Sequence, residues 1–307
     1  MEVSLEGYSS NIGETMFNLN LSLKQQQRLI VFAFLAIPLG LLFTFSYYPA
    51  SQLFYMSVTD WDGYAPAKNL VGLDNYQYLV EDPDILGPML NTFYYFVGAV
   101  VQLVLSLWFA VLVNSKLAGR NLFKTLLFIP FVLNAVAASM VFQIFYQVDG
   151  AFDNFLSSVG LEALIMPWLM DSDVVNWSLV AASVWRYLGF NLILFFGVLQ
   201  SIPQDQYEAA RIEGAGEWAQ FRYITLPSIK MIIGLQVLLA FVGSLSVFEI
   251  PMIITKGANG TKTFVMATLE TAFSFNDFGL ASAMAVLLLL IVVFFMILQK
   301  VLFGDKG

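Results

Sequence analysis

The sequence predicts an all-α integral membrane protein with six transmembrane helices. Of its 307 residues, 59% are hydrophobic and only 12% are charged, whereas about a quarter of the residues in soluble domains are charged. The charge-poor stretches are long enough to cross a bilayer, for which about 20 mostly apolar residues suffice. Runs such as Ala285–Leu298 do not alternate between polar and apolar residues, as the strands of a membrane barrel would. The alternative, a soluble protein with six buried core helices, is disfavoured in so short a chain.

The six predicted spans are separated by connections of unequal length. They lie at about residues 29–57, 87–115, 124–147, 174–200, 231–255 and 279–300. Away from the span ends, the only ionisable side chains inside them are Arg186 in the fourth span and Glu249 in the fifth. The transmembrane domain is therefore expected to cover residues 29–303, with tails at 1–28 and 304–307. No cleavable signal peptide is expected, because the first apolar run is too long for a signal core.

The basic residues predict which side of the membrane each loop faces. Lysine and arginine favour cytoplasmic loops, and most of them fall in the two tails, in the turn Lys116–Lys124 and in the loop 203–230. The other connections are rich in acidic residues. Both termini and the loop 203–230 are thus expected in the cytoplasm. On the opposite side, the segment Asp60–Pro88 is expected to be an ordered loop with a short helix near Leu73–Val80, which could receive an extracellular partner.

Several kinds of chemistry are disfavoured by the residues themselves. The chain has no cysteine and no histidine, which removes thiolate metal sites and the commonest general base. There is no phosphate-binding loop of the G-x-x-x-x-G-K-[ST] kind, so the chain should not bind ATP by itself. An enzyme is disfavoured, and no metal, cofactor or nucleic-acid partner is expected on this chain. The net charge of −8 carries little weight, because the acidic residues lie mostly on one side of the membrane. A channel or a secondary transporter remains open on topology alone.

The loop 203–230 contains a compact, charged helical segment between two apolar stretches. Asp205 is expected to cap a first helix of about two turns, with Glu208 three residues on. The glycines at Gly214–Gly216 are expected to break this helix through a left-handed conformation. A second helix should follow, with Trp218, Phe221 and Ile224 on one face, and should end at Leu226–Pro227.

This segment resembles the "EAA" loop of the membrane subunits of binding-protein-dependent ABC importers. The pattern runs E-A-A, three further residues to Gly-Ala, then F-x-x-I-x-L-P. It is matched by Glu208, Ala209, Ala210, Gly214, Ala215, Phe221, Ile224, Leu226 and Pro227. Two positions depart from it: Glu213 replaces the usual aspartate, and Met231 stands where a proline is often found.

A wider resemblance points to the sugar-transporting branch related to the maltose permeases. The stretch Trp185–Ala210 is similar to that branch's segment before the EAA loop, and Asn276–Ala283 is similar to its Y/F-x-D-F-G-x-A-S-A segment. Gly257, Ala258 and Asn259 replace a Gly-Gly-Pro of that branch. The resemblance implies a type I ABC importer permease fold and import of a sugar or oligosaccharide. Glycerol phosphate or a polyol is the alternative cargo, and a stand-alone secondary transporter is the alternative class.

The resemblance also implies partners. They are a second homologous permease subunit, two ATPase subunits that bind ATP and magnesium, and an extracytoplasmic solute-binding protein, with membrane lipid around the spans. The ATPase-docking residues implied are Glu208, Ala209, Ala210, Gly214, Ala215, Phe221, Leu226 and Pro227.

Polar residues inside the spans suggest where a substrate could pass. Such groups usually face the bundle interior or a water-filled path. The hypothesis is a pathway lined by Ser183, Arg186, Asn191 and Glu249, with Trp185 stacking on sugar faces. The alternative is structural: Arg186 and Glu249 form an ion pair between helices, or they extend toward a membrane surface. Asn134 and Gln143 are expected to make hydrogen bonds between helices.

Overall fold

The structure is a computed structural model that describes residues 22–66, 68–114 and 119–303. Residues 1–21 of the expected N-terminal tail, the C-terminal tail 304–307 and Lys116 of the predicted cytoplasmic turn lie outside the described residues. The chain divides into a unit that ends at Gln52 and a unit that begins at Leu53.

The N-terminal unit is one continuous apolar helix. It consists of α1 (Leu23–Leu42), the π-helical turn η1 (Phe43–Tyr47) and most of α2 (Tyr48–Met56). A capping box between Ser22 and Gln25 starts the helix several residues before the apolar stretch predicted at 29–57. None of the apolar window of this helix is buried within the chain. Such a surface suits lipid tails or another membrane protein rather than water.

In the unit that begins at Leu53, the regular elements among the described residues are all helices, apart from an isolated bridge between Thr59 and Leu70. Its elements are α3 (Asp74–Glu81), α4 (Pro83–Leu86), η2 (Gly87–Leu90), α5 (Asn91–Asn114), α6 (Arg120–Val132), α7 (Ala135–Phe145), α8 (Ala151–Ser158), η3 (Glu162–Leu164), α9 (Val175–Leu199), α10 (Gln204–Ile212), α11 (Glu217–Gln220), η4 (Phe221–Thr225), α12 (Leu226–Ser228), α13 (Lys230–Leu245), α14 (Glu249–Ile254), α15 (Phe264–Phe273) and α16 (Phe278–Phe303).

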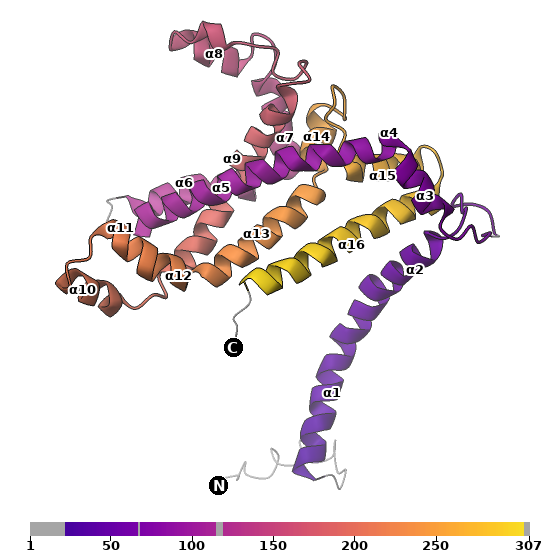
Figure 1. Ribbon diagram of the computed structural model, residues 1–307, viewed down its shortest axis with the longest axis horizontal. Coiled ribbons are helices and arrows are strands. Elements are labelled where there is room, and N and C mark those ends of the chain that lie inside the picture. The colour runs from indigo at the N-terminus through magenta and orange to yellow at the C-terminus, as the bar shows by residue number, and fades with distance from the viewer. Residues whose placement is uncertain (1–21, 67, 115–118, 304–307) are drawn as a thin grey trace, which may run out of the picture. The chain divides into compact units, whose positions relative to one another are not determined.

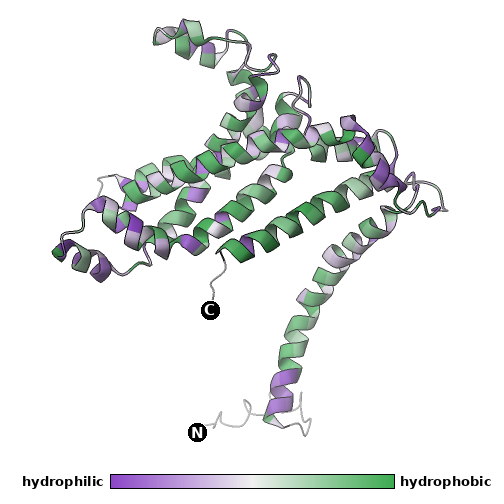
Figure 2. Cartoon of the chain, viewed as in Figure 1, coloured by the Kyte–Doolittle hydropathy of each residue, from purple (hydrophilic) through white to green (hydrophobic). Residues whose placement is uncertain are grey.

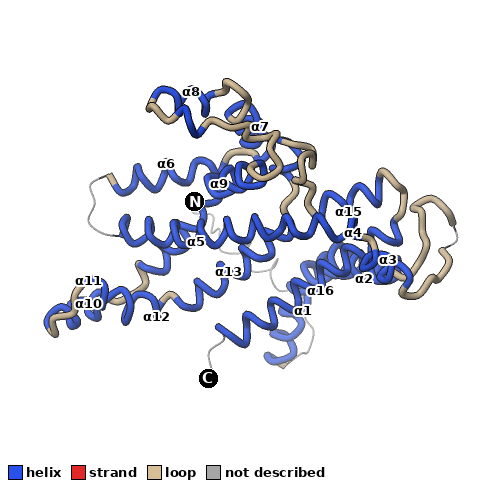
Figure 3. Tube along the Cα trace, turned by 45° about the horizontal axis from the view of Figure 1, so that its top comes forward, coloured by secondary structure: helices blue, strands red, loops and turns tan. Residues whose placement is uncertain are grey.

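A bundle of long helices forms the centre of this unit. α5 packs along α9, which also packs against α6, while α13 packs against α5 and α16 (Figure 1 and Figure 3). Gly189 permits the closest of these approaches, because a Cβ atom there would lie 1.9 Å from the carbonyl oxygen of Leu127. Green, apolar residues cover α5 and α16, whereas purple, polar residues gather on α10 and α11 at one end of the bundle (Figure 2).

The third predicted span is broken into two helices. α6 and α7 meet at a bend of 97°, where Leu133 adopts an extended conformation and the Asn134 side chain accepts a hydrogen bond from the backbone N–H of Val136. Asn134 therefore caps a helix, and the prediction that it bonds between helices is wrong. Gln143 does bond between helices, donating to the carbonyl oxygen of Ile254 at 3.2 Å. Within the described residues five helices could each cross a membrane, or six spans with this bent pair.

The segment after α2 is an ordered loop, as predicted. Its short helix is α3, and the Asn75 side chain donates to the carbonyl oxygens of Ser57 and Thr59. Hydrogen bonds from the side chain and the backbone N–H of Asn69 hold the pKa of Asp60 below its ordinary value.

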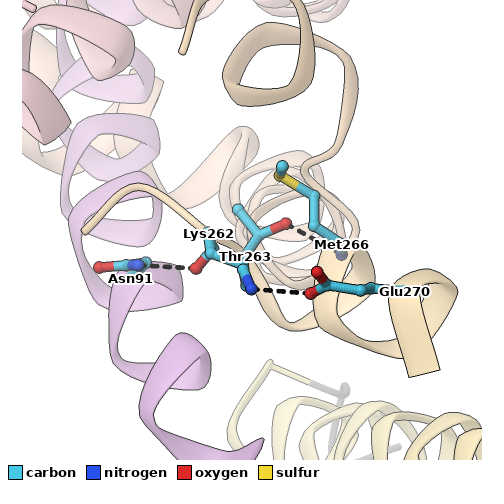
Figure 4. A network of polar contacts seen from close by, with 5 residues as sticks. All are labelled: Asn91, Lys262, Thr263, Met266 and Glu270. Carbon is cyan, nitrogen blue, oxygen red and sulfur yellow. Dashed lines mark hydrogen bonds and ion pairs between the residues drawn. The ribbon is translucent and has the colours of Figure 1, made fainter. Parts of the chain in front are cut away.

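The turn between α14 and α15 is tied to the start of α5. Asn91 donates to the carbonyl oxygens of Gly260 and Lys262, both at 2.7 Å. Figure 4 shows Lys262 reaching the Glu270 carboxylate on α15, where the two charged atoms are 2.7 Å apart. Asn259 has a φ of 56° and donates to the carbonyl oxygen of Leu169. These bonds fix the turn at the end of the bundle away from α10.

Candidate functional site

The charged segment between α9 and α13 forms a helical hairpin, which we call the coupling hairpin (residues 203–230). Its first helix, α10, begins directly after Pro203, whose φ is −59°. Asp205 therefore lies inside the first turn and does not cap the helix as expected, because proline already sets the chain in the conformation that precedes a helix. There its negatively charged carboxylate still interacts favourably with the positive, N-terminal end of the helix dipole. Glu208 follows on the same helix and is exposed.

A glycine in the left-handed backbone conformation ends the first helix of the hairpin, as the sequence predicts. Gly214 has a φ of +85°, and the backbone N–H of Ala215 donates to the carbonyl oxygen of Ala210 at 2.8 Å. This bond closes the end of α10 in the way that glycine-terminated helices commonly do. Gly216, two residues on, has a φ of −69°, which any residue can adopt.

Replacing Gly214 with valine should therefore impair transport. A β-branched residue in the left-handed region costs roughly 1–2 kcal/mol, and relief of that strain would turn α11 away from its present direction. Uptake by the assembled transporter in proteoliposomes should fall, while the amount of protein in the membrane stays unchanged. Gly216→Ala is the matched control and should transport normally, since a Cβ atom there meets nothing within 4 Å. Normal uptake by the Gly214 variant would contradict the assignment.

The second half of the hairpin differs from the prediction in how its apolar residues are arranged. Trp218 is 73% exposed and stacks on Phe221, whereas Ile224 packs against a buried cluster. The three residues do not share one buried face, because the π-helical turn η4 changes the angular spacing after Gln220. The helical stretch formed by α11, η4 and α12 ends at Ser228, one residue after Pro227 and close to the predicted end at Leu226–Pro227.

The motif residues divide into exposed and half-buried ones. Glu208, Ala209, Gly214 and Pro227 are exposed, whereas Ala210, Ala215, Phe221 and Leu226 are half-buried. The hairpin lies at one end of the bundle (Figure 1). Ile212, which the sequence analysis overlooked, is the most exposed large apolar side chain of the hairpin at 88%.

A cavity lined by both polar and apolar residues lies between α5, α9, α13 and α14. Its volume is about 400 Å³, within the range that small-molecule sites occupy. Four of the five predicted pathway residues line it: Ser183, Arg186, Asn191 and Glu249. The cavity also has two amides and three aromatic rings that sequence reasoning missed, namely Gln102, Gln236, Tyr95, Tyr187 and Phe190.

Trp185 is not part of the cavity wall. Its ring packs edge-on against Phe142, with the ring centroids 5.2 Å apart. Trp185 is 41% exposed, and its contact with Phe142 of α7 places its ring against another helix rather than in the cavity.

Three polar atoms in the cavity wall are buried without a hydrogen-bond partner. They are Tyr95 Oη, Arg186 Nε and Gln236 Oε1; Asn176 Oδ1, outside the cavity, is the only other such atom in the described part of the chain. A buried polar group without a partner costs roughly 1–3 kcal/mol. Because the three residues that carry these atoms line one cavity, their unsatisfied polar groups indicate a place for a polar ligand or ordered water.

The two charged residues of the cavity do not form an ion pair. The Arg186 guanidinium donates from Nη1 to the Tyr187 hydroxyl at 3.2 Å and from Nη2 to the carbonyl oxygen of Leu133 at 3.4 Å. The one salt bridge among the described residues joins Lys262 and Glu270. No three acidic side chains within the described ranges gather closely enough to hold a metal ion.

Comparison with known proteins places this arrangement in a family. Residues 102–304 match the model of the binding-protein-dependent transport system inner membrane component. The chain is 31% identical to the probable ABC transporter permease protein YurN of Bacillus subtilis over 91% of this chain and 97% of that protein. It is 28% identical to the trehalose/maltose transport system permease protein MalF of Thermococcus litoralis, over 91% and 95% of the two chains.

The fold is also that of a solved importer. A chain of a bacterial ABC transporter involved in the import of the acidic polysaccharide alginate superposes with a TM-score of 0.76 at 20% identity, over 90% of this chain and 96% of that chain. The family match over residues 102–304 covers the second half of α5, the other cavity helices and the coupling hairpin. This chain belongs to the family of inner-membrane permease components of binding-protein-dependent ABC transport systems.

Proposed function

We propose that this chain forms the membrane pathway of an ATP-driven importer for a sugar or oligosaccharide. The cavity carries the proposal: Tyr95, Arg186 and Gln236, whose side chains hold buried donor and acceptor atoms without a partner, line it together with the aromatic ring of Phe190. Sugar hydroxyls both donate and accept hydrogen bonds, and the apolar C–H faces of a sugar stack on aromatic rings. The relative named for trehalose and maltose supports the same class of cargo.

The rest of the proposed machine is distributed over other chains. A solute-binding protein delivers the sugar from outside, and a second homologous permease completes the pathway. Two ATPase subunits bind ATP and magnesium, so this chain itself hydrolyses nothing and needs no cofactor. The coupling hairpin and both termini face the cytoplasm. The proposed docking surface consists of Glu208, Ala209, Ala210, Gly214, Ala215, Phe221, Leu226 and Pro227, of which the exposed Glu208 and Ala209 would make direct contact.

The experiment is uptake by the purified complex in proteoliposomes loaded with ATP. The probes are labelled trehalose, maltose and lactose, with glycerol 3-phosphate and sorbitol as the competing cargo classes. ATP-dependent accumulation of a sugar supports the proposal. Accumulation of only glycerol 3-phosphate or sorbitol would replace the cargo, and uptake by this chain alone under an ion gradient would overturn the importer class.

Tyr95→Phe should separate binding from stability. Removing a buried, unpartnered hydroxyl should stabilise the empty protein by about 1 kcal/mol, while the loss of one hydrogen bond to the sugar should weaken its apparent affinity roughly tenfold. The thermal midpoint in detergent and the concentration dependence of uptake measure the two effects.

Tyr94→Phe is the matched control for that substitution. Tyr94 is the neighbouring residue on α5, stacks edge-on against Trp177 at 5.1 Å and does not line the cavity. Tyr94→Phe should neither raise the thermal midpoint nor weaken the apparent affinity for the sugar. An unchanged affinity in Tyr95→Phe would mean that the cavity does not hold the sugar.

A further inference from the structure

The first helix of the coupling hairpin is held to the bundle at very few points. Within α10 only Tyr207 and Ala210 are half-buried, and the other side chains are exposed. At its two ends α10 continues into Pro203 and into the glycine break at Gly214. Force applied to α10 can therefore reach the spans along the chain at these ends, or through these two side chains, of which Tyr207 is the larger.

Tyr207 makes both a polar and an apolar contact with the body of the protein. Its hydroxyl lies 2.9 Å from the hydroxyl oxygen of Thr225, a residue that is only 6% exposed at the end of the π-helical turn η4. Turns of this kind are rare and frequently occur at functional sites. The ring of Tyr207 packs against a buried cluster that includes Ile202 and Ile229.

The same cluster extends into the transmembrane helices. It contains Leu199 from the last turn of α9, and Leu103 and Val113 from α5. Ile229 is fully buried and immediately precedes α13. Tyr207 therefore touches a continuous packed layer that joins α5, α9 and the start of α13, the helices that also wall the cavity. Packed interiors transmit displacement because they have few voids.

We propose that Tyr207 is a positioning residue that couples α10 to the transmembrane helices, through its hydroxyl bond to Thr225 and its ring on this cluster. The inference rests on the proposed function, in which ATPase subunits move α10. With the bond intact, α10 and the ends of α9 and α13 move as one body. Without it, α10 can rock on the glycine break at Gly214 while the spans stay behind.

The test is Tyr207→Phe in the complete transporter, because phenylalanine keeps the ring and removes only the hydroxyl. The ATPase subunits should still co-purify and hydrolyse ATP. The amount of sugar moved per ATP should fall about fivefold, the effect expected from one hydrogen bond. Thr225→Val should give the same loss of sugar moved per ATP. Thr225→Ser should retain normal coupling, because serine keeps the hydroxyl. The double variant Tyr207→Phe/Thr225→Val should be no worse than either single one.

Tyr223→Phe is the matched control. It removes a tyrosine hydroxyl from the same hairpin, but Tyr223 is 78% exposed and should couple normally. An unchanged ratio of sugar to ATP in Tyr207→Phe would overturn the proposal, as would loss of ATPase co-purification, which would make Tyr207 a docking residue. Failure of the wild-type chain to recover any ATPase would instead refute the proposed function, so the two failures are distinguishable.

Discussion

Glu208→Lys is expected to abolish ATP-driven uptake. Glu208 lies on the exposed side of α10, where its carboxylate is free to meet a basic or amide group of an ATPase subunit. Hydrogen bonds to a charged group are worth roughly 1.5–3 kcal/mol, and reversing the charge places like charges together, which costs more than removal. ATPase association should weaken by about a hundredfold or more, and hydrolysis stimulated by substrate should disappear.

Glu217→Lys provides the matched control for the charge reversal. Glu217 is also exposed and lies on the same hairpin, but beyond the glycine break, in the first turn of α11. Glu217→Lys should weaken ATPase binding much less than Glu208→Lys does. Co-purification of the ATPase subunits and uptake in proteoliposomes should be measured for both variants, with thermal unfolding as the check on the spans. Equal and mild effects at the two positions would show that α10 does not dock as proposed.

Hydropathy and local motifs predicted the helical class and the glycine break because both are encoded in neighbouring residues. The stretch predicted at 87–115 coincides with η2 and α5, and Pro88 accounts for the tight turn at its start. The left-handed conformation of Gly214 follows from glycine itself. The family resemblance likewise rested on residues at fixed spacing, and the match over residues 102–304 confirms it.

The features that the sequence could not predict depend on how each helix is rotated about its axis and on side-chain caps that interrupt a helix. In a helix that is apolar all round, hydropathy does not tell which residues face the interior. Trp185 was therefore assigned to the cavity, which in the structure takes Tyr95 and Gln236 from other helices. The bend after Val132 was missed because it arises from a side-chain cap at Asn134 within an otherwise apolar run. Uncharged amides inside apolar spans were the available signal for Gln102 and Gln236.

Gly189→Ala is expected to be the most damaging small substitution in the transmembrane helices. A Cβ atom at this position would lie 1.9 Å from the carbonyl oxygen of Leu127 and 2.8 Å from the Cα atom of Phe128. Both are backbone atoms of α6, so no side-chain rotation can relieve the clash and the two helices must separate. Overpacking typically costs about 1–3 kcal/mol, and a clash with backbone should fall at the upper end of that range. The purified variant should unfold at a clearly lower temperature in detergent.

Gly197→Ala tests whether this loss comes from helix contact rather than from the added methyl group. Gly197 lies on the same helix, α9, but a Cβ atom there meets nothing within 4 Å. Alanine in an open helical position stabilises the folded protein by about 0.5–1 kcal/mol relative to glycine. The Gly197 variant should therefore unfold at the same temperature as the unmodified protein or at a slightly higher one. Because Gly189 sits between Arg186 and Phe190 of the cavity wall, separation of α6 from α9 should also weaken sugar binding. If the two alanine variants were equally stable, the close contact between α6 and α9 would not exist in the membrane.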